Sequence, residues 1–162
     1  NIAGLSDGSF DDLRADYMRL FVGVGRVLAA PWESVYFNDG RMVFQEQTLQ
    51  VRKWYRRFGL EAEKIHHEPD DHIGLELLFL SHLATLGSQA LIEQDHTRFE
   101  ELLNAQREFI KEHIGIWAPI WCNLVEEHAK TDFYKGLAHL TRGALSALSE
   151  VLDIKLAKAS AR

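Results

Sequence analysis

Apolar residues recur at helical spacing along most of the chain, and the most apolar stretch lies near its middle. One stripe at the 3.6-residue period of an α-helix consists of Ile73, Leu77, Leu80 and Leu83. The remaining faces of the same stretch are covered by Leu75, Leu78, Phe79 and Leu86. A helix that is apolar on nearly all sides is buried. The pattern therefore predicts a central helix over about residues 72–87, which Gly87 and Ser88 end.

The approach to this helix carries start signals. Pro69 has the fixed φ that suits the residues leading into a helix, and Asp70 or Asp71 can accept hydrogen bonds from its first free N–H groups. A carboxylate at this place also complements the helix dipole. We therefore expect the Asp70-Asp71-His72 turn to lie at the mouth of the central helix.

Similar patterns predict further helices on both sides. The first starts at Ser6 or Asp7, and others run over about 45–58 and about 89–113. Gly115 separates the helix over about 89–113 from one that bears Trp117 to His128, and a last helix, capped by Thr131 or Asp132, includes Val151. The last one is expected to turn one face to the core: Phe133, Leu137, Leu140, Ala144, Leu145, Leu148 and Val151. Around the Asn38-Asp39-Gly40 turn signal, an extended loop is favoured over a short hairpin. The prediction is an all-α, single-domain helical bundle over 1–162.

Composition narrows the class of protein. The 162 residues are 46% hydrophobic and 26% charged, as in an ordinary soluble domain. A net charge of −6, with no block of basic residues, argues against nucleic acid as the partner. No apolar run approaches the roughly 20 residues of a membrane span, and no signal peptide is evident. We expect a cytoplasmic protein without stable membrane insertion. The single cysteine, Cys122, lies among apolar residues and is expected to be a small buried hydrophobe.

The chain lacks the familiar enzyme motifs: no Gly-rich phosphate loop, no His-Glu-x-x-His, no Gly-x-Ser-x-Gly and no Cys-x-x-Cys. His66, His67 and His72 lie close to Glu68, Asp70 and Asp71. Because zinc needs several ligands that converge at fixed spacing, solvated loop histidines are the favoured interpretation over a metal site. We expect no catalytic residues and no metal.

Two short segments leave a structural and a functional interpretation open. Asp71 and His72 can be a helix cap and an exposed side chain, or a polar pair with a second role. Trp32, in a loop stiffened by Pro31, can be a core residue or an exposed ring that awaits an apolar partner.

Three segments together resemble one family. They are Tyr17-Met18-Arg19-Leu20-Phe21-Val22-Gly23, Pro31-Trp32-Glu33-Ser34-Val35-Tyr36, and Glu68-Pro69-Asp70-Asp71-His72 before an apolar helix. In this order they are similar to the TorD/DmsD family of cytoplasmic maturation chaperones for molybdenum-containing reductases, which the twin-arginine pathway exports. The resemblance covers most of the chain and continues weakly to Phe133-Tyr134-x-x-Leu137.

The resemblance implies a chaperone, not an enzyme. It implies binding of the twin-arginine signal peptide and the apo-reductase precursor, protection from premature export, and assistance in cofactor insertion. It assigns an apolar client site to Tyr17, Leu20, Phe21, Pro31 and Trp32, and a polar pair to Asp71 and His72. Weak guanine-nucleotide binding, reported for some members, is carried with it, and no other cofactor is implied.

One departure concerns the start of the chain. Family members have further helices before the Tyr-x-x-Leu-Phe segment, whereas here Tyr17 lies close to residue 1. Two explanations stay open: a truncated chain, or helices that a partner subunit supplies in a homodimer formed by exchange of elements.

A twin-arginine leader carries two arginines followed by a short apolar stretch. Glu68, Asp70, Asp71 and Glu33 could pair the guanidinium groups, while Trp32, Phe21 and Leu20 accept the apolar part. We therefore expect Trp32→Ala and Asp71→Ala each to weaken binding and to leave helicity largely intact. The alternatives are a helical adaptor with a partner outside this export pathway, and a small metal-dependent hydrolase that uses Asp70, Asp71 and nearby histidines.

Overall fold

The computed structural model describes residues 7–23, 27–61 and 68–156, and in these ranges the chain is helical without a strand. The helices are α1 (Asp7–Tyr17), α2 (Glu46–Arg57), α3 (Ile73–Ile92), α4 (His96–Glu112), α5 (Ile114–His128) and α6 (Asp132–Val151). Two short turns complete them: the π-helical turn Met18–Val22 and the 3₁₀ turn Glu33–Tyr36. The all-α prediction is confirmed, and no hairpin forms in the described segment around Asn38.

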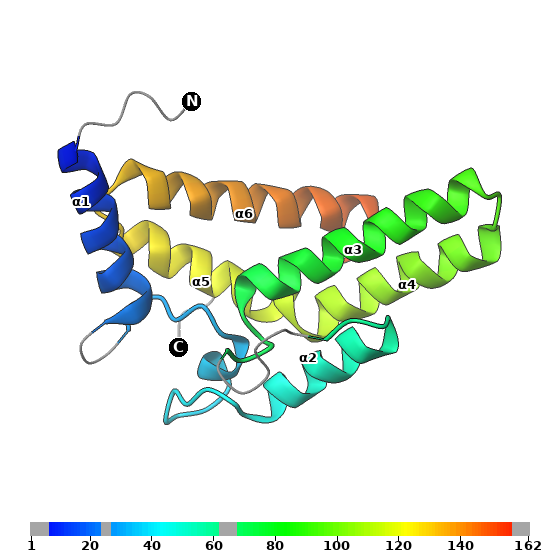
Figure 1. Cartoon of the computed structure of the whole chain (residues 1–162), viewed down its shortest axis with the longest axis horizontal. Coiled ribbons are helices and arrows are strands. Elements are labelled where there is room, and N and C mark those ends of the chain that lie inside the picture. The colour runs from blue at the N-terminus through cyan, green and yellow to red at the C-terminus, as the bar shows by residue number, and fades with distance from the viewer. Residues whose placement is uncertain (1–6, 24–26, 62–67, 157–162) are drawn as a thin grey trace.

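Two antiparallel helix pairs make up most of the molecule. α3 packs along α4, and α5 packs along α6 (Figure 1). α1 crosses the ends of α5 and α6, while α2 lies beneath α3 and α4 (Figure 1). The loop that contains Trp32 runs between these parts, close to the start of α3. This arrangement brings the predicted segments from residues 31–36 and 68–72 together.

The central helix is longer than predicted, since α3 continues past Gly87 to Ile92. Glycine costs about 1 kcal/mol in a helix interior relative to alanine, but packing can outweigh that cost. Gly87 is buried opposite the Phe99 ring of α4, so the helix gains from the close approach. The turn comes instead at Gln94, whose φ is 59°, and Asp95 caps α4 by accepting a hydrogen bond from the N–H of Arg98 at 2.9 Å.

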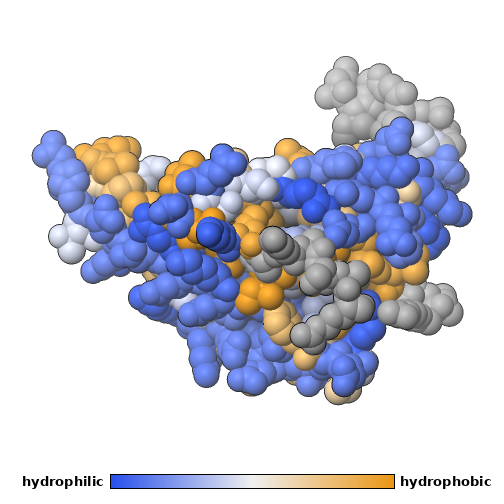
Figure 2. Space-filling model, turned by 180° about the vertical axis from the view of Figure 1, so that it is seen from behind, coloured by the Kyte–Doolittle hydropathy of each residue, from blue (hydrophilic) through white to orange (hydrophobic). Residues whose placement is uncertain are grey.

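α3 also differs from a second expectation. By length and apolar composition it could cross a membrane, although no such segment was predicted. The core helix of a soluble protein passes the same test, and α3 packs against α4 and α5. Its outer end, where Leu91 and Ile92 are exposed, gives hydrophobic surface at the tip of the α3–α4 pair (Figure 2).

The corner between α4 and α5 is tight. It turns at His113, and Gly115 lies inside the first turn of α5, not between the helices as predicted. A Cβ on Gly115 would lie 2.4 Å from the carbonyl oxygen of Ile110. Only glycine therefore fits this corner without a shift of the backbone.

The inward face of α6 was predicted only in part. Leu145 is buried and Leu148 is half-buried, but Phe133, Leu137, Leu140, Ala144 and Val151 are exposed. The buried stripe is instead made by smaller residues: Ala138, Thr141, Leu145 and Ser149. Small side chains let α6 lie close to α5, and the larger apolar residues are left on the outer side.

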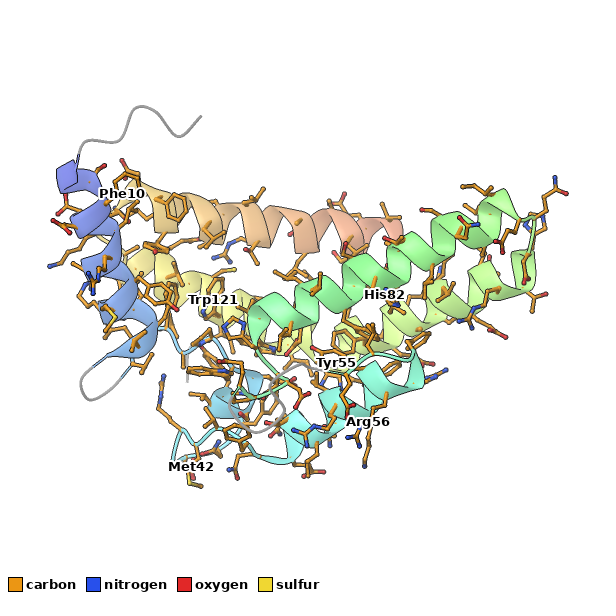
Figure 3. The ribbon with its side chains drawn as sticks, viewed as in Figure 1. Phe10, Met42, Tyr55, Arg56, His82 and Trp121 are labelled. Carbon is orange, nitrogen blue, oxygen red and sulfur yellow. The ribbon has the colours of Figure 1, made fainter. Side chains whose placement is uncertain are left out.

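Aromatic rings from three helices fill the core beneath α3. The ring of Phe79 lies 4.8 Å from that of Phe109 in α4 and 5.0 Å from that of Tyr55 in α2, centroid to centroid. Tyr55 points inward from α2, whereas Arg56 beside it points to solvent (Figure 3). Cys122 is buried in α5 as predicted, and burial raises the pKa of its thiol to about 11, so the thiol stays protonated.

Candidate functional site

The loop at Trp32 is joined to the mouth of α3 by a short antiparallel bridge between Trp32 and His72. The N–H of Glu33 donates to the carbonyl of Asp71, and the N–H of Ile73 donates to the carbonyl of Pro31, both at 2.9 Å. Two segments that lie far apart in the sequence therefore form one rigid unit.

Asp71 fixes this unit through its side chain. Its carboxylate accepts hydrogen bonds from the backbone N–H of Ser34 and from the hydroxyl of Thr48 in α2, both at 2.7 Å. The residue is fully buried. Because both oxygens are used inside the protein, Asp71 joins the loop, α2 and the start of α3.

Asp70 performs a similar task. Its Oδ2 accepts from Nε and a terminal nitrogen of Arg52 at 2.9 and 2.6 Å, and its backbone carbonyl accepts from the Tyr55 hydroxyl at 2.9 Å. Asp70 too is fully buried. In this conformation neither aspartate is open to the guanidinium group of a partner, and Asp70 already pairs with one from its own chain.

Trp32, His72 and Glu68 form a half-buried rim above this buried base. The indole N–H of Trp32 donates to the Glu68 carboxylate at 2.8 Å, and the rings of Trp32 and His72 meet edge to face with centroids 6.0 Å apart. His72 caps α3, since its Nδ1 accepts from the N–H of Gly74 at 3.1 Å. Burial lowers the pKa of His72, which keeps the imidazole neutral and free to accept this bond. We refer to these three residues as the Trp32 rim.

Behind the rim lies a group of buried ionisable side chains. The carboxylate of Glu33 lies 3.0 Å from Nδ1 of His113, and Glu76 in α3 accepts from the indole N–H of Trp117 at 3.3 Å. Burial raises the pKa of Glu33, although its bond to His113 opposes that effect. Burial and the neighbouring Glu33 carboxyl raise the pKa of Glu76 well above its ordinary value. The cluster thus holds carboxyl groups that resist ionisation.

The remaining predicted residues belong to a different cluster. Phe21 is buried and its ring meets those of Tyr17, Trp121 and Tyr134 at centroid distances of 5.5, 6.0 and 5.5 Å. Leu20 is fully buried, and Tyr17 is 47% exposed. The structure therefore places Tyr17, Leu20 and Phe21 against α5 and α6, where Trp121 also lies (Figure 3).

A hollow of about 370 Å³ opens beside Trp32. Its lining, apart from Trp32, is apolar with one cation: Val27, Ala30, Val35, Val43 and Arg41. The volume of the hollow is near the lower end of the range of about 300–1,000 Å³ for ligand pockets.

Pro31, the last of the predicted site residues, is buried next to Trp32 in the chain.

Comparison with known proteins places the chain in a family. The family model described as "Nitrate reductase delta subunit" matches residues 3–123, which is most of the chain. This chain belongs to the nitrate reductase delta subunit family. The match agrees with the predicted resemblance to the TorD/DmsD chaperones.

The curated relatives of this family member are chaperones. The Tat proofreading chaperone DmsD of Salmonella typhi is 31% identical over 149 residues, which cover 92% of this chain and 66% of that protein. The chaperone protein TorD of Aliivibrio salmonicida is 30% identical over 128 residues, which cover 79% of this chain and 58% of that protein. TorD of Vibrio cholerae serotype O1 is 28% identical over 142 residues, which cover 88% of this chain and 63% of that protein. The chain thus spans 58–66% of the length of these relatives. Their names support the prediction of a chaperone and not an enzyme.

Sequence reasoning missed the residues that build the base of the site in this family member. Thr48, Arg52 and Tyr55 hold the two aspartates, yet the sequence analysis placed them only within the helix predicted over about 45–58. Their i, i+4 and i+7 spacing places them on one helix face, and an arginine on the same face as buried residues is a signal for a buried partner. Among the described residues no group of histidine, cysteine and carboxylate side chains could hold a metal ion. His66 and His67 lie outside the described residues.

Proposed function

We propose that this chain is a client-specific chaperone that binds the twin-arginine leader of a molybdenum-containing reductase in the cytoplasm. Two facts support the proposal: the chain belongs to a family with Tat proofreading chaperones among its relatives, and it has a preformed aromatic rim. Binding of the leader and the apo-enzyme would delay export while the cofactor is inserted.

The observation that carries the site assignment is the Trp32 rim. Trp32 is half-buried and is held by the bridge to His72 and by the bond to Glu68, while the buried Asp71 fixes Ser34, two residues further along the same loop. A tryptophan held in one orientation loses little entropy when a partner packs on it, and aromatic anchors dominate many interfaces. This is the form expected of a peptide-binding site that exists before its ligand arrives.

The buried aspartates have a different role in this proposal from the one first expected. Asp70 and Asp71 are fully buried and position the rim, whereas Glu68 is a half-buried residue of the rim itself. Glu68 is therefore the group assigned to the guanidinium of the leader. Tyr17, which is 47% exposed and packs against the buried Phe21 ring, is assigned to the client body.

Calorimetry with a synthetic leader tests the proposal. We expect a peptide with two arginines before its apolar stretch to bind, and the same peptide with two lysines to bind more weakly, because only arginine gives the bidentate pair. Trp32→Ala should weaken binding by about tenfold or more, as loss of an aromatic anchor does. Leu140→Ala, on the exposed side of α6, is the control. Equal affinity for both peptides would favour an adaptor with another partner.

A further inference from the structure

The loop beside the Trp32 rim carries exposed apolar side chains that the fold does not use. Between the 3₁₀ turn and α2, Phe37 is 44% exposed, Met42 56% and Phe44 46%. Met42 lies at the outer end of this loop, away from the helices (Figure 3). Such a concentration on one loop is typical of an interaction site and not of scattered surface residues. We refer to residues 37–44 as the apolar loop.

The apolar loop is built to hold its shape. The side chain of Asn38 accepts from the N–H of Met42 at 2.8 Å and donates to its carbonyl at 2.9 Å, and it also donates to the carbonyl of Ser34 at 2.6 Å. Arg41 and Phe44 have φ values of 50° and 58°, in the left-handed region that bulky residues avoid. Strained backbone that a specific side chain sustains is a feature of binding loops.

The hollow lies under this loop and is shared with the rim. Val43 and Arg41 of the loop line it together with Val35 and Trp32. The guanidinium of Arg41 donates to the carbonyl of Val27 at 3.2 Å, which fixes a positive charge at the hollow. Trp32 therefore stands between two different surroundings: the carboxylate of Glu68 at its indole N–H, and the apolar hollow with Arg41.

This charge arrangement selects one part of a leader peptide. Arg41 repels a second guanidinium, so the hollow disfavours the arginines of a leader, whereas Glu68 attracts them. The apolar walls accept uncharged side chains, and the N–H groups of Arg41 suit a peptide carbonyl. A chain with arginines first and apolar residues next matches the order from Glu68 across Trp32 to the hollow.

We propose that the hollow and the exposed side chains of the apolar loop, Phe37, Met42 and Phe44, together form the subsite for the apolar stretch of the leader. This inference rests on the proposed function and adds residues that the resemblance does not assign.

Leader peptides that differ in one part at a time test the subsite. The first has two arginines and an apolar stretch, the second two arginines and a serine-rich stretch, and the third two lysines and the apolar stretch. Each is titrated into the wild-type chain, into Val43→Phe, which fills the hollow, and into the triple variant Phe37→Ser, Met42→Ser, Phe44→Ser. Leu78→Ser and Leu140→Ser, which remove exposed apolar side chains elsewhere (65% and 70% exposed), are the controls.

We expect the wild type to prefer the apolar stretch over the serine-rich one by at least about tenfold, and both loop variants to lose most of that preference. Their preference for arginine over lysine should stay. Variants that discriminate the stretches as well as the wild type does would overturn the subsite while the proposed function stands. No binding by the wild type would overturn the proposed function itself. A dimer in sedimentation velocity that only the triple variant abolishes would assign the loop to a second copy of the chain and overturn the inference.

Discussion

At the scale of single residues, Asp71 joins more parts of the site than any other side chain discussed above. Replacement by alanine leaves the N–H of Ser34 and the hydroxyl of Thr48 without their acceptor in a buried place. A hydrogen bond to a charged group contributes about 1.5–3 kcal/mol. We therefore expect Asp71→Ala to lower the free energy of unfolding by about 3 kcal/mol or more, measured by urea denaturation.

Asp39→Ala is the control for this variant, because Asp39 lies exposed in the turn of the same loop region. It should change the free energy of unfolding by less than about 0.5 kcal/mol. If the two variants were equally stable, Asp71 would not be the support of the Trp32 rim. The expectation from the sequence, that Asp71→Ala weakens binding at unchanged helicity, is thereby extended: binding falls because the rim loses its base.

The sequence could identify the residues at the rim but not their environment. A proline before two acids and an apolar run predicts a capped helix start, and Trp32 after a proline predicts a rigid loop. Which carboxylates are buried depends on partners that lie far away in the sequence. Arg52 comes 18 residues before Asp70, and Ser34 comes 37 residues before Asp71. No local pattern reports such pairs.

At the scale of elements, the α4–α5 corner gives a prediction with a built-in control. Gly115→Ala places a Cβ against the backbone of Ile110, so the corner must shift. We expect a loss of about 2 kcal/mol or more in the free energy of unfolding. Gly143→Ala in α6, where an added Cβ meets nothing within 4 Å, should instead stabilise by about 0.5–1 kcal/mol. Thermal unfolding of both variants checks the difference in sign.

The two faces of α6 provide a second comparison. Leu145 is 2% exposed and Leu140 is 70% exposed. Leu145→Ala should cost about 2–5 kcal/mol by leaving a cavity, whereas Leu140→Ala should stay within about 0.5 kcal/mol of the wild type. Equal losses in urea denaturation would mean that the outer face of α6 is covered in solution.

The presence of the helices could be predicted from the sequence because each helix is long and strongly periodic. The residues at which helices end, and the faces that they bury, were harder to predict. α3 passes Gly87 because packing against Phe99 outweighs the weak helix propensity of glycine. In α6 the stripe of large apolar residues looked like the inward one, but the side that reaches α5 is the side with small residues. Periodicity defines faces, and only the neighbouring helices decide which face is buried.

At the scale of the whole molecule, the cluster of Glu33, Glu76 and His113 ties the loop at Trp32 to α3 and to the α4–α5 corner. Three parts of the fold thus meet at buried side chains, and burial raises the pKa of two of them, Glu33 and Glu76. Glu33 follows Trp32 directly in the chain, so a change in this cluster is transmitted to the rim through one peptide unit. Packing and protonation are therefore linked in this molecule.

The sign of that linkage follows from the pKa shifts. The folded-state pKa of Glu76 is raised above its ordinary value of 4.5, so the native state holds a proton that the unfolded state has already released. The stability from this group is fully present below that ordinary value and is lost as pH rises through the folded-state pKa. The pKa of His72 is lowered from 6.5 by burial. Below pH 6.5 the contribution of His72 to the free energy of unfolding therefore rises with pH, which is opposite in sign to the contribution of Glu76.

Glu76→Gln separates the two contributions, because His72 is the same in both proteins. Glutamine keeps the shape of a protonated glutamate but cannot ionise. The variant should therefore not show the loss of folding stability that ionisation of Glu76 causes at high pH. We expect the wild type to become steadily less stable than Glu76→Gln as pH is raised from 5 to 9 in urea denaturation. A difference that stays constant with pH would mean that Glu76 is already ionised when folded. The buried carboxylate would then need a compensating positive charge.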